Sequence, residues 1–115
     1  MAKYEDTLHG SFDEFLHRLD NGILSGSVSA SFEDGSDYRS GDIRCAVRVY
    51  ERYSMMGSNR VSINITLIGN GNDLFLSAIT SGGSQAIFFK INTIGEERFL
   101  NRVVDLVEEY KRERT

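Results

Sequence analysis

The sequence predicts an α+β fold, a curved antiparallel sheet of five to six strands with two helices on one face. Two capping signals predict the helices, because Ser11-Phe12-Asp13-Glu14 and Thr93-Ile94-Gly95-Glu96 share the S/T-x-x-E spacing. Between them, apolar and polar residues alternate with a period of two, which is typical of half-buried strands. Such strands need a cover on their apolar face, and two helices can supply it. The predicted order is therefore strand, helix, four or five strands, helix.

The first two elements are an edge strand from Lys3 to His9 and a helix that begins after Ser11. In the strand, Tyr4 and Leu8 face inward. In the helix, apolar residues recur at i, i+3, i+4, i+7 and i+11 and form one stripe of Phe12, Phe15, Leu16, Leu19 and Ile23. Gly22 or Gly26 can provide the left-handed residue that ends this helix.

Strands at 27–34 and 42–53 follow, separated by a polar, glycine-bearing loop at 34–41. In the second of these strands, the apolar face predicted to point inward consists of Ile43, Cys45, Val47 and Val49. The opposite, polar face carries Arg44, Ala46, Arg48, Tyr50 and Arg52. The next strand places Val61, Ile63, Ile65 and Leu67 inward.

The remaining elements are two strands and the longest helix. Asn70-Gly71 predicts a tight turn, because both residue types tolerate positive φ. Strands are predicted at 74–81 and 86–91, with a turn at 82–85 between them. A helix at 96–114 closes the core with a stripe of Phe99, Val103, Leu106, Val107 and Tyr110.

Composition indicates one domain, residues 1–115, in the cytoplasm. The net charge of −4 gives no general attraction to nucleic acid. No run approaches the ~18 apolar residues that a membrane span needs. Cys45 is the only cysteine and indicates a reducing compartment. We therefore expect neither nucleic acid nor a membrane as a partner.

A family resemblance covers nearly the whole chain. The stretches at 44–53, 59–62, 77–86 and 88–93 resemble a family of short uncharacterised proteins from Gram-positive bacteria. The order of elements is similar to the TATA-binding-protein-like fold and to reduced helix-grip folds. The resemblance implies a bacterial cytosolic setting, and it transfers no site residue because the family has no assigned activity.

A row of cationic side chains is the main candidate site. Arg44, Arg48 and Arg52 are spaced by four along one strand, so they share a face with Tyr50. Guanidinium groups bind carboxylates and phosphates, which makes this row a candidate platform for a small anionic ligand. The alternative is a solvated face whose arginines pair with carboxylates across strands. Gln85 ends a glycine-rich turn that either binds an anion through backbone N–H groups or only turns the chain.

The other reactive side chains carry weaker signals. Asp34, Asp37 and Asp42 lie in one predicted loop without the spacing of a calcium site, which favours ordinary turn chemistry. Cys45 is predicted to be a buried, inert thiol. His9 and His17 lack the spacing of metal ligands or of a catalytic triad. The sequence predicts no catalytic residue, no metal site and no cofactor.

Two functions remain open at this stage. The first is a non-enzymatic binding or interaction module that uses the polar sheet face or a groove between sheet and helix. The second is a small helix-grip-like enzyme or carrier with a pocket between the sheet and the C-terminal helix. We also expect a two-fold homodimer, because Phe75 and Ile79 leave apolar surface on the face away from the helices.

Overall fold

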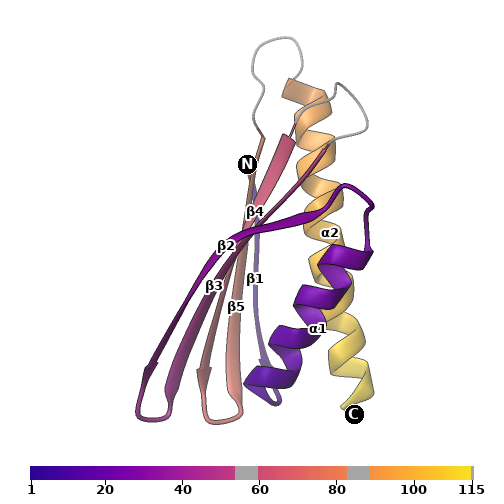
Figure 1. Cartoon of the computed structure of the whole chain (residues 1–115). Helices are drawn as coiled ribbons and strands as arrows, with labels where there is room; N and C mark the ends of the chain where they lie inside the picture. Colours follow the sequence, from indigo (N-terminus) through magenta and orange to yellow (C-terminus); the bar gives the residue numbers. More distant parts are fainter. Residues whose placement is uncertain (54–59, 83–88, 115) are drawn as a thin grey trace.

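The computed structural model describes residues 1–53, 60–82 and 89–114, with side chains for all of these except 89–95. The chain forms one five-stranded antiparallel sheet and two helices, which confirms the predicted fold class (Figure 1). The elements are β1 (Ala2–His9), α1 (Phe12–Ser25), β2 (Ser31–Ser40), β3 (Ile43–Tyr53), β4 (Arg60–Asn70), β5 (Asp73–Gly82) and α2 (Phe89–Glu113).

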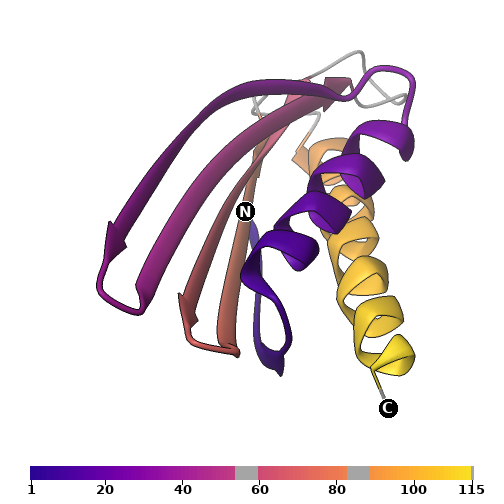
Figure 2. The same ribbon diagram turned by 60° about the horizontal axis from the view of Figure 1, so that its bottom comes forward.

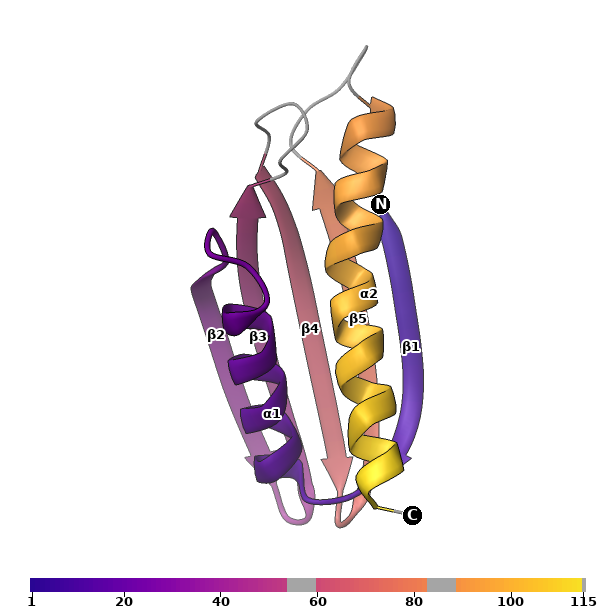
Figure 3. The same ribbon diagram turned by 90° about the vertical axis from the view of Figure 1, so that its right-hand side faces the viewer.

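The strands lie in the order β1-β5-β4-β3-β2. Both helices lie on the same side of the sheet, which we call the helix-facing side; the opposite side is the outer face (Figure 3). α2 runs along β5, β1 and β4, and α1 lies beside it (Figure 3). Beyond α1, the hairpin of β2 and β3 continues outward at an angle to the helix, so that this edge of the sheet stands apart from it (Figure 2).

One hydrophobic core lies between the helices and the sheet. Its largest fully buried side chains come from every layer: Tyr50, Tyr110, Phe15, Phe99, Leu19, Ile23, Ile63, Ile65, Leu67 and Leu76. The predicted inward faces of β4 and β5 and the stripe of α2 are confirmed by this core. No helix among the described residues has the length and apolar composition needed to cross a bilayer.

The cap of α1 follows the sequence signal in part. Ser11 is the N-cap, and its side chain accepts a hydrogen bond from the backbone N–H of Glu14 at 3.3 Å. The backbone N–H of Ser11 donates to the Tyr110 hydroxyl at 3.1 Å, which ties the start of α1 to α2. The helix ends at Gly26, which has φ −78° and is right-handed rather than left-handed.

Strand β3 presents to the helices the face that was predicted to be outermost. Ala46 and Tyr50 are each only 1% exposed and pair with the buried residues Leu67 and Ile63 of β4. The opposite set lies on the outer face: Ile43, Cys45, Val47 and Val49. The prediction was wrong because it counted arginine as polar, whereas the long arginine stems can cover apolar surface while their charged ends stay near water.

Two predicted segments also differ from the structure. The segment 34–41, predicted as a loop, mostly belongs to β2, and the turn to β3 is made at Gly41, with φ +59°. Residues 89–91, predicted as strand, are the first turn of α2, so Glu96 lies inside that helix instead of capping it. The predicted tight turn after Asn70 is confirmed, with Gly71 at φ +61°. The rest of the predicted strand, 86–88, and most of the turn, 83–85, lie outside the described residues.

Candidate functional site

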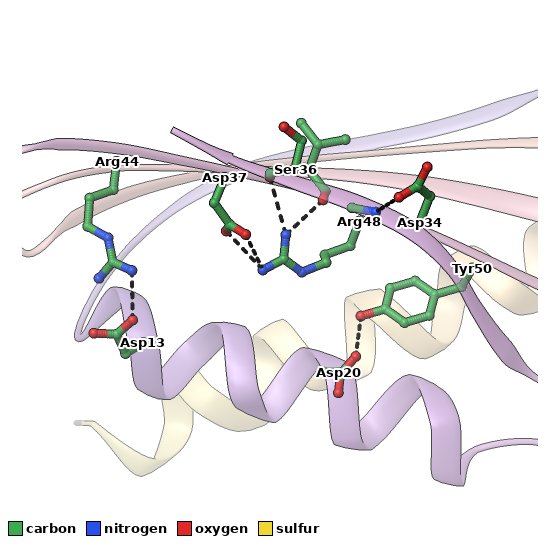
Figure 4. A network of polar contacts seen from close by, with 10 residues as sticks. Asp13, Asp20, Asp34, Ser36, Asp37, Arg44, Arg48 and Tyr50 are labelled. Atoms are coloured by element: carbon green, nitrogen blue, oxygen red, sulfur yellow. Dashed lines mark hydrogen bonds and ion pairs between the residues drawn. The ribbon is translucent and has the colours of Figure 1, made fainter. Parts of the chain in front are cut away.

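The predicted arginine row lies on the helix-facing side of β3, where α1 and α2 can reach it. Arg44 forms an ion pair with Asp13 of α1, with 2.8 Å between Nη2 and Oδ1 (Figure 4). Its guanidinium carbon lies 4.2 Å from the centroid of the Phe12 ring, a cation–π contact. The hydrogen bond from Arg44 lowers the pKa of Asp13. Arg44 therefore joins the first turn of α1 to the sheet.

Arg48 is held by the neighbouring strand. Its Nη2 donates to both carboxylate oxygens of Asp37 at 2.9 and 3.2 Å, and its Nη1 donates to the carbonyl oxygens of Val47 and Ser36 (Figure 4). The side chain is only 18% exposed. This is the cross-strand pairing that the sequence left open as the alternative to a ligand, with Asp37 as the partner.

Tyr50 lies under α1 and donates a hydrogen bond from its hydroxyl to Asp20 Oδ1 at 2.6 Å (Figure 4). Burial, and then this hydrogen bond, raises the pKa of Tyr50. The Phe32 ring of β2 meets the Tyr50 ring edge-on, with 5.9 Å between centroids. Tyr50 is thus a neutral donor that fixes the position of a carboxylate on α1.

Arg52 does not share this neighbourhood. Its guanidinium carbon lies 4.8 Å from the centroid of the Phe99 ring in α2, and burial followed by the charge of Arg98 lowers its pKa. The structure therefore brings Arg44, Arg48 and Tyr50 together along α1 and places Arg52 against α2. Gln85 lies outside the described residues.

Two hollows line the contact between α1 and the β2–β3 hairpin. The larger has a volume of about 530 Å³ and is bordered by Asp13, Leu16, His17, Asp20, Leu24, Phe32 and Arg48. The smaller has a volume of about 400 Å³ and is bordered by Ser11, Phe12, Arg39, Gly41, Asp42, Arg44, Gly71 and Asn72. They meet at the ion pair of Asp13 and Arg44, because each hollow contains one member of that pair. We call the two hollows together the α1 groove.

Several groove residues were missed by the sequence reasoning. Leu16 belongs to the apolar stripe of α1 and was assigned to the core, yet it is partly exposed and lines the groove. Phe32 is 50% exposed and borders the larger hollow; the sequence placed it in the strand predicted at 27–34. Arg39 was assigned to a loop and lies on β2.

The remaining candidate residues are spread over different parts of the molecule. Asp37 points to the helix-facing side, whereas Asp34 shares a register row with outer-face residues, so the predicted acidic loop does not converge on one point. The described residues contain no group of three His, Cys, Asp or Glu side chains placed to hold a metal ion. Cys45 is partly exposed on the outer face, so the prediction of a buried thiol was wrong. His17 bonds to Asn21 on α1.

Comparisons with known proteins show one relationship. No curated protein and no solved structure matches the chain. One family matches residues 1–111, nearly the whole chain, and it is described as a family of unknown function (DUF6054). The chain belongs to this family of unknown function, DUF6054.

Proposed function

We propose that this protein is a binding module that holds a small amphipathic anion, with a carboxylate or phosphate head and an apolar body, in the α1 groove. The observation that carries the proposal is the meeting of two chemically different hollows at the ion pair of Asp13 and Arg44. One hollow contains two arginines, and the other exposes apolar side chains. A ligand with a charged head and an apolar body matches that division.

The head would bind between Arg39 and Arg44. Arg39 is exposed, and within the described residues no hydrogen bond from its side chain is formed. The contact of Arg44 with Asp13 involves one of its two terminal nitrogens. The N-terminus of α1 begins at Phe12 beside them and adds the positive end of the helix dipole. Asp42 borders this hollow and Asp13 pairs with Arg44 beside it, so two arginines face two carboxylates, and the head of the ligand would compete with Asp13 for Arg44.

The apolar body would lie on Leu16, Leu24 and Phe32 in the larger hollow. The two carboxylates there have partners within the protein, since Asp13 binds Arg44 and Asp20 accepts the Tyr50 hydroxyl hydrogen bond. Neither is left as an unpaired charge to repel an apolar chain. This arrangement supports an anionic amphiphile over an amine.

The experiment compares two ligands with the same tail and opposite heads. Isothermal titration with octanoate and with octylamine, and with inorganic phosphate as a head without a tail, separates the contributions of head and body. We expect octanoate to bind more tightly than phosphate and octylamine to show no binding. Binding of octylamine in preference to octanoate would overturn the proposal.

Variants then locate the head. Arg39→Gln and Arg44→Gln should each weaken octanoate binding by at least about tenfold, because each removes a charge-assisted hydrogen bond. Arg98→Gln removes the same charge from an exposed position on α2 and is the matched control. Equal effects of all three variants would show that only net charge matters.

A further variant tests the ion pair at the junction. Asp13→Asn removes the carboxylate that competes for Arg44, so it should strengthen octanoate binding about fivefold, the effect of a unit charge at about 4 Å in water. Weaker binding by this variant would place the head elsewhere.

The alternative pocket between the sheet and α2 has less support. The side chains of α2 that face the sheet are almost completely buried and occupy that space: Phe99, Val103, Val107 and Tyr110. An enzyme or carrier of the helix-grip kind needs a cavity there. We therefore place the binding site at α1.

A further inference from the structure

The outer face of the sheet carries apolar side chains that neither helix covers. Ile43, Ile68 and Ile79 are 40%, 38% and 42% exposed, and Tyr38 at the β2 edge is 67% exposed. Register places Tyr38 beside Cys45, Cys45 beside Ile68, and Ile68 beside Phe75. A continuous apolar row therefore crosses four strands. We propose that a second copy of this chain covers the outer face and forms a two-fold sandwich of sheets with its axis along β4.

The strand order makes this face complementary to itself. β4 is the central strand, with β3 and β2 on one side and β5 and β1 on the other. A two-fold axis along β4 brings β3 over β5 of the partner and β2 over β1 of the partner. Ile68 then meets the partner subunit's Ile68 on the axis, and Val49 meets the partner subunit's Ile79. The same contacts occur twice, as an isologous interface requires.

One register row carries complementary charges at its two ends in the same arrangement. One register row runs Asp34, Val49, Asn64, Ile79, Lys3 from the β2 edge to the β1 edge. The axis places Asp34 opposite the partner subunit's Lys3, and the reverse contact also forms. Packed sheets rotate by about 30°, which shifts edge residues by about 5 Å, within the reach of a lysine side chain. The exposed position of both residues leaves them available for this contact.

The size of the face also fits a stable dimer. Five strands spaced by about 4.8 Å and about ten residues long give a face of roughly 24 by 33 Å, or about 800 Å². A stable protein interface buries about 800 Å² on each partner. The outer face thus has the area of a full interface. On its central strand β4, Ile68 lies among the polar residues Ser62, Asn64 and Thr66, and charged residues such as Lys3 and Asp34 lie at the rim.

Sedimentation over a range from low to high micromolar tests the dimer directly. The wild-type protein should sediment at twice its chain mass of 12.9 kDa and dissociate on dilution. Ile68→Glu places two carboxylates against each other on the axis and should weaken association by at least about tenfold. Val28→Glu is the matched control, because Val28 is fully exposed and lies outside the sheet.

A charge swap tests the orientation of the two copies. Lys3→Asp puts a carboxylate opposite Asp34 at both ends of the row and should weaken the dimer. The double variant Lys3→Asp with Asp34→Lys restores opposite charges and should recover the wild-type affinity. Circular dichroism of each variant confirms that the sheet is intact.

Three results would overturn the inference. If the protein sediments at the mass of a single chain up to high micromolar concentration, it does not form the dimer. If Ile68→Glu and Val28→Glu change the dissociation constant equally, the interface does not lie on the outer face. If the double variant fails to recover the wild-type dimer affinity, the two copies are not related by a two-fold axis along β4. The dimer does not depend on the proposed ligand, because the α1 groove lies on the helix-facing side. Arg39→Gln should therefore leave the sedimenting mass of the protein unchanged.

Discussion

Replacement of Phe99 by alanine tests how the long helix holds the sheet. Phe99 is 1% exposed, in the core between α2 and the strands, and its ring lies against the guanidinium of Arg52. Removal of a fully buried phenylalanine costs about 3–5 kcal/mol, from lost burial and from the cavity left behind. The lost cation–π contact adds about 0.5–1 kcal/mol. We expect a total near 4–5 kcal/mol, a large part of the roughly 6–17 kcal/mol available to a domain of this length.

The assay is urea denaturation followed by far-ultraviolet circular dichroism, with Phe32→Ala as the matched control. Phe32 is 50% exposed, so the same substitution there should cost only about 1 kcal/mol. A loss below about 1 kcal/mol for Phe99→Ala, which is the usual size of a mild substitution, would show that Phe99 is not a core residue. Equal losses for the two variants would refute the burial argument.

Two other substitutions probe contacts of α2 with the rest of the chain. The hydrogen bond from Lys111 lowers the pKa of Asp6. The interaction therefore contributes about 1 kcal/mol or less to the free energy of unfolding at pH values above the pKa of Asp6 in the unfolded chain, and this contribution is lost as the pH falls through the pKa of Asp6 in the folded protein. Asp6→Asn should therefore reduce the urea midpoint at neutral pH but not in strong acid; a pH-independent difference would contradict this. Gly22→Ala would bring a Cβ within 2.3 Å of a Leu106 methyl carbon, so we expect a loss of about 1–3 kcal/mol despite the better helix propensity, and a stabilised variant would show that Leu106 moves aside.

The sequence predicted best where one face of a strand is clearly apolar. In β4, the apolar residues Val61, Ile63, Ile65 and Leu67 alternate with Ser, Asn and Thr, so only one register buries the apolar set, and the structure has that register. The start of α1 was also predicted correctly, because the Ser11 side chain accepts a hydrogen bond from the free backbone N–H of Glu14, only three residues away. These features depend on neighbouring residues, which a single sequence contains.

Strand β3 could not be oriented in the same way because both of its faces contain residues able to be buried. The face with Ala46 and Tyr50 wins because Arg44 lies over the Phe12 ring and Arg52 over the Phe99 ring. Those rings belong to the two helices, so the outcome is decided by tertiary contacts. The composition of the strand alone favours the opposite choice.

The full extent of β2 and the α1 groove could not be predicted from the sequence for a related reason. β2 is polar and mostly exposed, and it exists because its backbone pairs with β3. The register shifts between Phe32 and Asp34, which changes the phase of the side chains along the strand. A bulge of this kind leaves no sequence pattern, so the sequence could not predict that Phe32 and Arg39 lie beside α1.

The pairing of β1 with β5 has a consequence for the order in which this protein folds. Ala2 pairs with Thr80, whereas β2 to β5 are joined by hairpins between consecutive strands. Loop closure over such a long separation is slow, because its entropy is lost before the contacts form. We expect the four-stranded meander of β2 to β5 to form early in folding and β1 to join it later, together with α2. Two residues of α2 contact this part of the chain, since Lys111 binds Asp6 within β1 and Tyr110 binds Ser11 just after it. Pulsed hydrogen exchange during refolding should accordingly protect the amides shared by β3 and β4 before those shared by β1 and β5.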